Sequence, residues 1–199
     1  AIADGSFHQE KEMLEALEKA KGGRLHLMGL VSEGGVHSHQ QHLHELISAA
    51  NNAGLQNVFI HAFTDGRDTL PMLASEFVKN LESHLEGTKA QIATVHGRYF
   101  AMDRDMRMER IAKSWNLLCK TRNQYQSEEF ESAVSGIESS YAKGTGDEFI
   151  EPFRVRGVDG EIRNGDVVIC FNYRTDRCRQ ITSALTQTDF PDHNMHALD

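Results

Sequence analysis

The sequence predicts an α/β fold with three layers, in which helices flank a largely parallel or mixed sheet. Short apolar runs, typical of strands buried on both faces, alternate with helical patterns from Leu25 to Leu118. This alternation implies right-handed crossovers between neighbouring parallel strands. A chain of 199 residues with 39% hydrophobic and 25% charged residues has the composition of an ordinary globular protein. We therefore expect residues 1–199 to form a single domain.

Three apolar runs predict the first strands of the sheet: Leu25 to Val31, Val58 to Phe63 and Ala90 to Val95. Ser6 and Gln9 have capping-box spacing and predict a helix before the first run. We expect Thr69 to cap a later helix that carries Pro71 in its first turn. The residues expected to face the core from these helices are Met13, Leu14 and Leu17, then Leu43, Leu46, Ile47 and Ala50, then Leu73, Phe77, Leu81 and Leu85, and last Ile111, Trp115 and Leu118.

The second half of the chain has a different pattern. We expect a helix over 127–143 and then a hairpin that pairs 153–156 with 161–163 around Asp159-Gly160, so that a β-hairpin lies near 153–171. The apolar run 167–171 predicts another strand, and 174–186 a helix. The polar end, 189–199, is predicted to be a linker.

Charge and composition exclude several classes of partner. The net charge of −8 argues against nucleic acid, because phosphate backbones favour a basic surface. We also expect no membrane contact, since no apolar run approaches the ~18 residues of a membrane span. Cys119, Cys170 and Cys178 lack the spacing of a zinc knuckle or a disulfide framework. Three free thiols indicate a reducing compartment, and we expect a cytoplasmic protein.

Polar clusters follow four of the predicted strands at the point where each strand ends. They read G-G-V-H-S-H from Gly34, D-G-R-D from Asp65, G-R-Y-F-A-M-D-R-D from Gly97 and N-Y-R-T-D-R from Asn172. Ligands of open α/β sheets bind in the crevice outside the carboxyl ends of the strands. Each cluster alone fits a turn or a solvated helix end, but the set predicts one site.

The residue types in these clusters indicate a small anionic substrate. Arginine presents a fork of donors that suits carboxylate and phosphate oxygens. No glycine-rich nucleotide-binding pattern is present, so a small molecule with both a carboxylate and a phosphate fits better than a nucleotide. The sequence shows no convincing nucleophile. The expected crevice residues are His37, Arg67, Asp68, Arg98, Arg104, Arg174 and Arg177, with Asp103 as a further candidate.

Two local alternatives accompany this hypothesis. Arg107 and Arg110 are expected to stay with the following helix and to pair with nearby carboxylates. Four histidines, His37, His39, His42 and His44, suggest a metal site, but their spacing does not provide a closed coordination shell and no cysteine lies near them. We therefore expect no metal ligand in this chain, and we expect His42 and His44 on a solvated helix face.

The clusters also carry a resemblance to a known family. The segments L-M-G-L-V-S-E-G-G-V-H-S-H, H-A-F-T-D-G-R-D-T, H-G-R-Y-F-A-M-D-R-D, D-E-F-I-E-P and F-N-Y-R-T-D-R-C-R-Q-I occur in this order. Together they resemble the cofactor-independent phosphoglycerate mutases, specifically their inserted substrate-binding (phosphotransferase) domain. The resemblance covers essentially the whole chain. One departure is Met108, which stands where the family usually has tryptophan.

The resemblance implies an isomerase of glycolysis and gluconeogenesis that interconverts 3-phosphoglycerate and 2-phosphoglycerate. It implies that His37, Arg67, Asp68, Arg98, Arg104, Arg174 and Arg177 contact the substrate, and that Asp68 has the catalytic role of shuttling the proton of the glycerate hydroxyls. A separate phosphatase-like domain of the same polypeptide would carry two Mn²⁺ ions and a serine that becomes phosphorylated. That domain is expected outside this chain, so these 199 residues alone are expected to be inactive.

Two other functions remain open from the sequence. One is a non-catalytic binding module for small phosphorylated acids. The other is a metal-dependent hydrolase that uses the histidine cluster, starting with His37 and His39.

Overall fold

The computed structural model describes Ile2 and residues 6–198. Its centre is a six-stranded sheet of order β4-β5-β3-β2-β1-β6. Strands β1, β2, β3 and β6 are parallel, whereas β5 runs antiparallel to β3. The strands are β1 (Leu25–Leu30), β2 (Val58–Thr64), β3 (Ala90–Gly97), β4 (Glu129–Phe130), β5 (Phe153–Val155) and β6 (Val167–Cys170). The predicted α/β class and the largely parallel, mixed sheet are confirmed.

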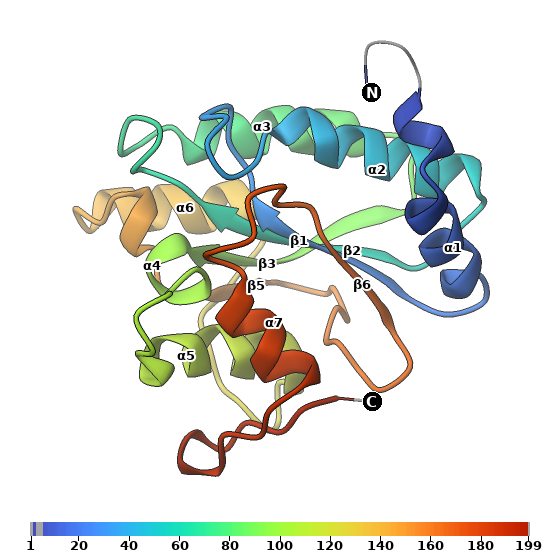
Figure 1. The fold of residues 1–199 in the computed structure, drawn as a ribbon. Coiled ribbons are helices and arrows are strands. Elements are labelled where there is room, and N and C mark those ends of the chain that lie inside the picture. The colour runs from blue at the N-terminus through green and yellow to red at the C-terminus, as the bar shows by residue number, and fades with distance from the viewer. Residues whose placement is uncertain (1, 3–5, 199) are drawn as a thin grey trace.

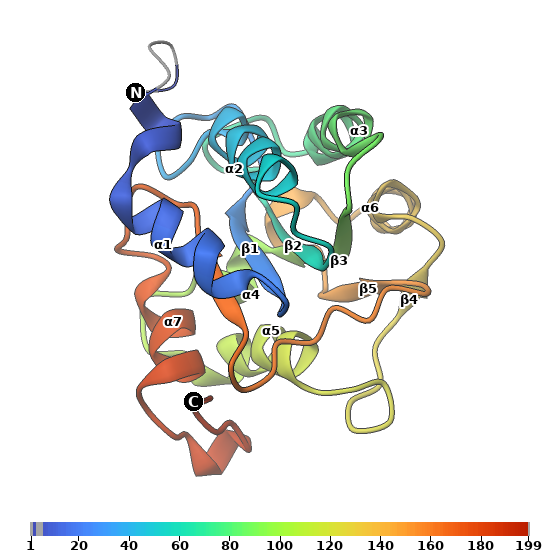
Figure 2. The same cartoon turned by 90° about the vertical axis from the view of Figure 1, so that its right-hand side faces the viewer.

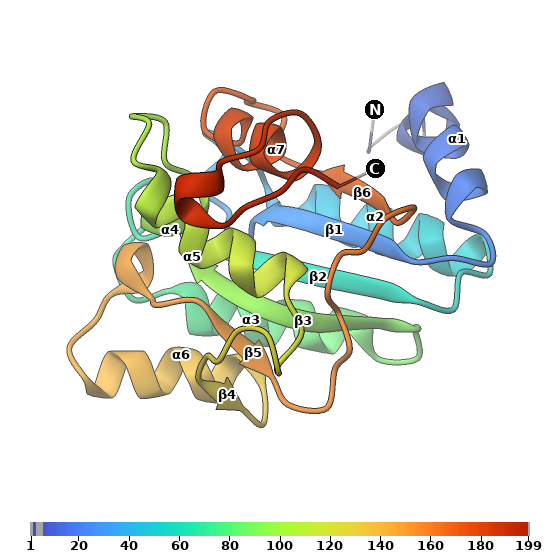
Figure 3. The ribbon, with the colours of Figure 1, turned by 90° about the horizontal axis from the view of Figure 1, so that it is seen from below.

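Helices cover both faces of this sheet (Figure 1). The α-helices are α1 (Lys11–Ala20), α2 (Gln40–Asn52), α3 (Ala74–Leu85), α4 (Arg98–Ala101), α5 (Met108–Cys119), α6 (Ala133–Ala142) and α7 (Arg179–Thr186), and the 3₁₀-helices are η1 (Ser6–Gln9), η2 (Asp147–Phe149) and η3 (Pro191–His193). Helices α2 and α3 lie above the sheet and α5 and α7 lie below it, and Figure 3 shows α5 in front of the strands in the view from below. Figure 2 shows β4 and β5 at the side of the sheet opposite to α1 and α7.

Two hydrophobic clusters explain why the central strands carry apolar side chains on both faces. Leu25 and Leu27 point into the cluster beneath α1, α2, α3 and α6. Met28 and Leu30 point into the other cluster, with α5 and α7. Since both faces of β1 are buried, neither face needs polar residues. Met108, at the start of α5, is 7% exposed and belongs to the second cluster.

Three buried histidines cross the second face of the sheet in a continuous chain of hydrogen bonds. His26 Nε2 lies 3.0 Å from Asp166 Oδ2, and His26 Nδ1 lies 3.0 Å from His61 Nε2. Thr94 Oγ1 then joins His61 Nδ1 and His96 Nε2, each at 2.7 Å. Asp166 can only accept, so neutral His26 donates to it from Nε2 and accepts at Nδ1. The same order repeats along the chain, and each neutral imidazole donates from Nε2 and accepts at Nδ1. The proton of every ring in the chain is thereby placed.

The N-terminal helices differ from prediction in their starts. Helix α1 begins at Lys11, after η1, with Glu10 at its N-cap. Met13 and Leu17 are buried as expected, but Leu14 is 49% exposed. Helix α3 begins at Ala74 rather than near Thr69. Its cap comes from a distant residue, because Asp147 Oδ2 accepts from the N–H groups of Leu73 and Ala74 at 2.9 and 3.0 Å.

The predicted hairpin is wrong. Strand β5 pairs with β3 and β4, and the segment 161–163 contains no strand. The reason is tertiary: Ile162 is buried beside α5, and its N–H donates to the carbonyl of Leu118 at 2.7 Å. The predicted helix over 127–143 is shorter, because Glu129–Phe130 forms β4 and Ser132 caps α6 through a capping box.

The C-terminal elements are also shorter or more ordered than expected. Helix α7 begins at Arg179, and only residues 176–178 of the preceding segment form a turn. The predicted linker, whose last residue Asp199 lies outside the described residues, packs on the second cluster. Met195 is fully buried there and Phe190 pairs with it. Among the described residues, no helix is long and apolar enough to cross a membrane.

Candidate functional site

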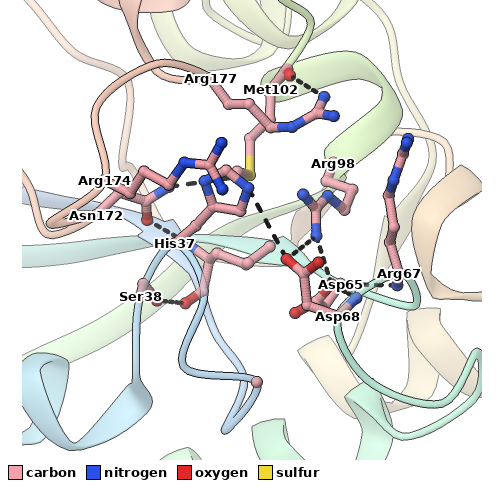
Figure 4. A network of polar contacts seen from close by, with 12 residues as sticks. His37, Ser38, Asp65, Arg67, Asp68, Arg98, Met102, Asn172, Arg174 and Arg177 are labelled. Atoms are coloured by element: carbon pink, nitrogen blue, oxygen red, sulfur yellow. Dashed lines mark hydrogen bonds and ion pairs between the residues drawn. The ribbon is translucent and has the colours of Figure 1, made fainter.

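The four polar clusters meet at the carboxyl ends of β1, β2, β3 and β6, because these strands are parallel. Figure 4 shows His37 from the loop after β1, Arg67 and Asp68 from the loop after β2, and Arg98 from the start of α4. It also shows Arg174 and Arg177, from the loop after β6, on the other side of His37 and Arg98. The structure thus brings together side chains that are far apart in the sequence.

A buried arginine holds two aspartates at the centre of the site. Arg98 Nη1 lies 2.6 Å from Asp65 Oδ1 and 2.7 Å from Asp68 Oδ2. Asp65 also forms an Asx turn, since its Oδ1 accepts from the N–H groups of Arg67 and Asp68. Its Oδ2 accepts from the Ser32 hydroxyl at 2.7 Å. Burial alone would raise the pKa of Asp65, but the Asp68 N–H, Ser32 and Arg98 together lower it. Asp65 is therefore a fixed anion.

His37 lies between two carboxylates. Its side chain is 3% exposed, with Nε2 3.9 Å from Asp68 Oδ2 and Nδ1 3.5 Å from Asp176 Oδ1. Burial and the nearby Arg98 guanidinium lower the pKa of His37, although the two carboxylates oppose this shift. We therefore treat His37 as a neutral imidazole at pH 7, with one proton to donate.

A cavity of about 270 Å³ adjoins this centre. Its lining residues are Arg67, Arg98, Tyr99, Met102, Asp103, Arg104, Asp105, Arg107, Arg110, Glu148, Phe149 and Arg177. Burial lowers the pKa of Arg177, and the charges of Arg104, Arg98 and Arg67 lower it further. The cations around Arg177 therefore repel one another, and an anion in the cavity would relieve that repulsion.

The remaining arginines are only partly neutralised by carboxylates. Arg104 Nη1 lies 3.0 Å from Asp176 Oδ2, and Arg174 pairs with the same carboxylate. Arg67 lies 3.5 Å from Glu148, and the side chains of Arg67 and Arg104 are 55% and 46% exposed. Arg177 donates to the carbonyl of Met102 at 3.4 Å. These side chains keep donors that can turn toward a ligand.

Asn172 places the loop that carries Arg174 and Arg177. Its Oδ1 accepts from the Leu30 N–H at 2.9 Å, and its Nδ2 lies 3.1 Å from Cys178 Sγ. The side chain approaches β1 at Gly29, where a Cβ atom would lie 2.7 Å from Asn172 Oδ1. Glycine at this position therefore allows the amide to dock and to fix the start of the loop.

The stretch from Gly97 to Arg110 divides less cleanly than predicted, because all four of its arginines line the cavity. Arg98 and Arg104 contribute to the crevice, whereas Arg110 pairs with Asp103 at 3.4 Å and lies over the Tyr99 ring. Asp103 is buried and accepts from the N–H of Arg107 at 3.1 Å. Asp103 thus shapes the loop before α5. The structure adds that Arg107 and Arg110 also line the cavity.

All seven predicted contact residues lie at this site, but only four of them line the cavity. Arg67, Arg98, Arg104 and Arg177 line the cavity. His37, Asp68 and Arg174 lie beside it and connect through the ion pairs of Asp68 and Asp176. Sequence reasoning missed Asp176, Glu148 and the central role of Asp65. Asp176 could have been found, because it lies between Arg174 and Arg177 in the same motif.

The four clustered histidines have separate roles. His39 caps α2 by accepting from the Gln41 N–H. His42 packs against Phe7 and Tyr173, and His44 stacks on His84, so these rings are half-buried rather than solvated as predicted. Among residues 2 and 6–198, no group of three or more His, Cys, Asp and Glu side chains is placed to hold a metal ion.

Comparisons with known proteins agree with this geometry. The family model described as "BPG-independent PGAM N-terminus" matches residues 1–199. The 2,3-bisphosphoglycerate-independent phosphoglycerate mutase of Flavobacterium psychrophilum is 44% identical over 205 residues, which cover 100% of this chain and 40% of that protein. The enzyme of the same name from Clostridioides difficile is 43% identical over 194 residues, covering 96% of this chain and 37% of that protein.

A solved structure shares the fold. A crystal structure of the phosphoglycerate mutase of Leishmania mexicana, determined at low cobalt concentration, matches with a TM-score of 0.83 and 30% identity. The match covers 96% of this chain and 37% of the other. The chain thus spans about 40% of the length of the curated relatives. It belongs to the 2,3-bisphosphoglycerate-independent phosphoglycerate mutase family and corresponds to the part that the family model describes as its N-terminus.

Proposed function

We propose that this chain binds 2-phosphoglycerate and 3-phosphoglycerate as the substrate-holding part of a phosphoglycerate mutase. The observation that carries the proposal is the convergence of Arg67, Arg98, Arg104 and Arg177 around one cavity. A phosphoglycerate has a phosphate and a carboxylate, and each of these groups suits the planar fork of an arginine. A small molecule with a single anionic group would need fewer arginine side chains.

Asp68 is the proposed catalytic residue. Its Oδ2 accepts from Arg98 at 2.7 Å, and its side chain is 17% exposed, so it is held in place but accessible. A carboxylate in this position can accept hydrogen bonds from the glycerate hydroxyls and take or return their proton. Arg98 keeps the carboxylate aimed, while the other arginines hold the two ends of the substrate.

The bond-breaking chemistry is proposed to lie outside these 199 residues. A phosphatase-like domain of the same polypeptide would supply two Mn²⁺ ions and the serine that carries the phosphoryl group between the two hydroxyls. Positioning by this chain and phosphoryl transfer by that domain would together interconvert the two phosphoglycerates. The relatives support this division of labour, because the chain spans only about 40% of their length.

An exposed apolar rim supports docking of such a domain over the site. Large hydrophobic side chains that are at least 42% exposed occur around the crevice, in loops and at the end of η2: Val36, Leu70, Met72, Met106, Phe149 and Tyr173. These segments follow β1, β2, α4, α6 and β6. An apolar rim around a charged centre is typical of a surface that another protein body covers. Such cover would exclude water and protect a phosphoserine from hydrolysis.

The experiment replaces Arg177 in the complete polypeptide with alanine. We expect turnover to fall on the order of a hundredfold, because positioning and charge stabilisation contribute several kcal/mol. Bound metal, measured by elemental analysis, should stay unchanged. Arg156→Ala serves as the matched control, since Arg156 is exposed and pairs with Glu131 away from the cavity. Loss of metal with Arg177→Ala, or normal turnover, would overturn the proposed role.

A further inference from the structure

Asp176 is the carboxylate at which three loops of the site meet. Its Oδ2 accepts from Arg104 Nη1, which comes from the loop between α4 and α5, at 3.0 Å. Arg174, two residues before it in the loop after β6, approaches through Nε at 3.0 Å and Nη2 at 3.2 Å. Asp176 Oδ1 lies 3.5 Å from Nδ1 of His37, which comes from the loop after β1. The Asp176 side chain thus contacts side chains from three loops of the site.

The contact with His37 joins two shielded polar atoms. His37 Nδ1 and Asp176 Oδ1 are both cut off from solvent, and neither has a hydrogen bond of good geometry among the described residues, although Arg174 Nε lies 3.0 Å from Asp176 Oδ1. An Nδ1 lone pair facing a carboxylate oxygen would be repulsive, whereas an Nδ1–H would be attracted to it. Asp176 is the nearer of the two carboxylates that flank the ring, at 3.5 Å against 3.9 Å for Asp68, and therefore favours the neutral tautomer with its proton on Nδ1. In that tautomer Nε2 is an acceptor, and it faces Asp68 at 3.9 Å.

The contacts with the arginines leave donors available. Asp176 engages Arg104 through Nη1 and Arg174 through Nε and Nη2. The ion pairs and hydrogen bonds among the described residues do not occupy Nη2 of Arg104 or Nη1 of Arg174. Without Asp176, these half-exposed side chains would gain rotamer freedom and would move away from the positive charges of Arg98 and Arg177.

We propose that Asp176 is a positioning residue that holds Arg104 and Arg174 at the site and fixes the proton of His37 on Nδ1. It acts through these three side chains. The proposal deepens the proposed function and rests on it for the identity of the ligand. In the opposite role, Asp176 would occupy the place of the substrate anion and compete with it. The two roles differ in the sign of the effect on affinity.

The first measurement needs no ligand. Long-range ¹H–¹⁵N NMR spectra of the ¹⁵N-labelled chain at pH 7.5 distinguish the two neutral tautomers of His37. We expect Nδ1–H in the native chain and in Asp176→Asn, whose side-chain oxygen can still accept from Nδ1. In Asp176→Ala the ring should shift toward Nε2–H, which can donate to Asp68. A native His37 in the Nε2–H tautomer, or one that Asp176→Ala leaves unchanged, would overturn the proposed proton placement.

The second measurement is calorimetric titration with 3-phosphoglycerate. Asp176→Asn and Asp176→Ala should both weaken binding roughly tenfold, because each loses its charge-assisted hydrogen bonds to the arginines. Asp192→Ala, which removes an exposed aspartate in η3, is the control and should change neither readout. Tighter binding by either Asp176 variant would show a competing anion and overturn the positioning role. If the native chain binds no 3-phosphoglycerate, the proposed function fails, while the tautomer measurement still decides the role of Asp176 toward His37.

Discussion

Arg98 and Asp65 form an ion pair with Nη1 and Oδ1 only 2.6 Å apart, and their side chains are 2% and 1% exposed. The pair links the start of α4 to the loop after β2. The same guanidinium nitrogen holds Asp68, so the geometry of the proposed catalytic carboxylate depends on a buried structural pair. Removing one partner of such a pair leaves a charge uncompensated in a medium of low dielectric constant.

Asp65→Asn should therefore destabilise the fold. We expect a loss of about 3 kcal/mol in the free energy of unfolding, because the Arg98 charge loses its closest partner. Urea denaturation followed by circular dichroism measures this change. Asp192→Asn, at an exposed position, should stay within about 0.5 kcal/mol of the native chain. Equal stability of the two variants would show that the pair does not contribute as described.

Stability should fall in mild acid because of the buried histidines. Burial, followed by the charges of Arg24 and Arg163, lowers the pKa of His26 to about 3, and burial lowers the pKa values of His61 and His96 well below 6.5. The unfolded chain therefore binds more protons than the folded chain below about pH 6.5, so stability is lost as the pH falls.

Each of these histidines should contribute about 1.4 kcal/mol of destabilisation for each pH unit between about pH 6 and its folded pKa. Urea denaturation at pH 7.5, 6.0 and 5.0 tests the slope. His196→Gln, at an exposed position, should not alter it. A free energy of unfolding that is constant from pH 7.5 to pH 5.0 would contradict the assignment of neutral, buried rings.

Thr94 links two of the buried histidines in the chain of hydrogen bonds, since its Oγ1 contacts both His61 Nδ1 and His96 Nε2. Thr94→Val keeps the shape but leaves one ring acceptor and one ring donor unpaired in the core. We expect a loss of about 2–4 kcal/mol in the free energy of unfolding, because an unsatisfied buried polar group costs about 1–3 kcal/mol. Thr186→Val, at an exposed position of α7, is the control. A cost below about 0.5 kcal/mol would show that the hydrogen-bond chain is not maintained in solution.

Asp147 should contribute more to the stability of the fold than its position in the short 3₁₀-helix η2 suggests. It accepts from the N–H groups of Leu73 and Ala74 and from the Tyr141 hydroxyl. Asp147→Ala should cost about 2 kcal/mol, the upper end of the range for losing a helix cap. Differential scanning calorimetry gives the change. An unchanged melting temperature would mean that α3 has another cap.

The apolar rim gives a prediction that separates docking from folding. Met106 is 67% exposed and Leu70 70% exposed, and neither lines the cavity, so replacing both with serine should leave the stability of this chain almost unchanged. In the complete polypeptide, the same change should lower turnover if a second domain covers the site. Leu14→Ser, at an exposed position of α1, provides the control. Normal turnover of the rim variant would argue against docking at this face.

The sequence could predict the order of the central elements, because hydrophobic periodicity is a local property. Runs such as Leu25 to Val31 report burial on both faces directly. The meeting of the polar clusters in one site could likewise be predicted, since parallel strands place their carboxyl ends together. A metal-free chain, a partner domain with Mn²⁺ and a cytoplasmic location stay predictions.

The errors arose where distant residues decide local structure. The start of α3 depends on Asp147, which lies far along the chain, and no local pattern near Thr69 reveals it. The predicted hairpin failed because Ile162 finds its partners on α5 instead of on Arg154 and its neighbours. Asp176 was overlooked because a carboxylate between two arginines reads as local charge pairing, whereas its partners come from three loops.

The most direct test of the central claim is an NMR titration of the ¹⁵N-labelled chain with 3-phosphoglycerate up to millimolar concentrations, which detects even weak binding. We predict saturable shifts at His37, Arg67, Asp68, Arg98, Arg104, Arg174 and Arg177, and none at the buried His26, His61 and His96. Glycerol, which lacks both anionic groups, should produce no shifts. An absence of shifts, or shifts confined to residues away from the arginine-lined cavity, would contradict the claim that this chain holds the substrate.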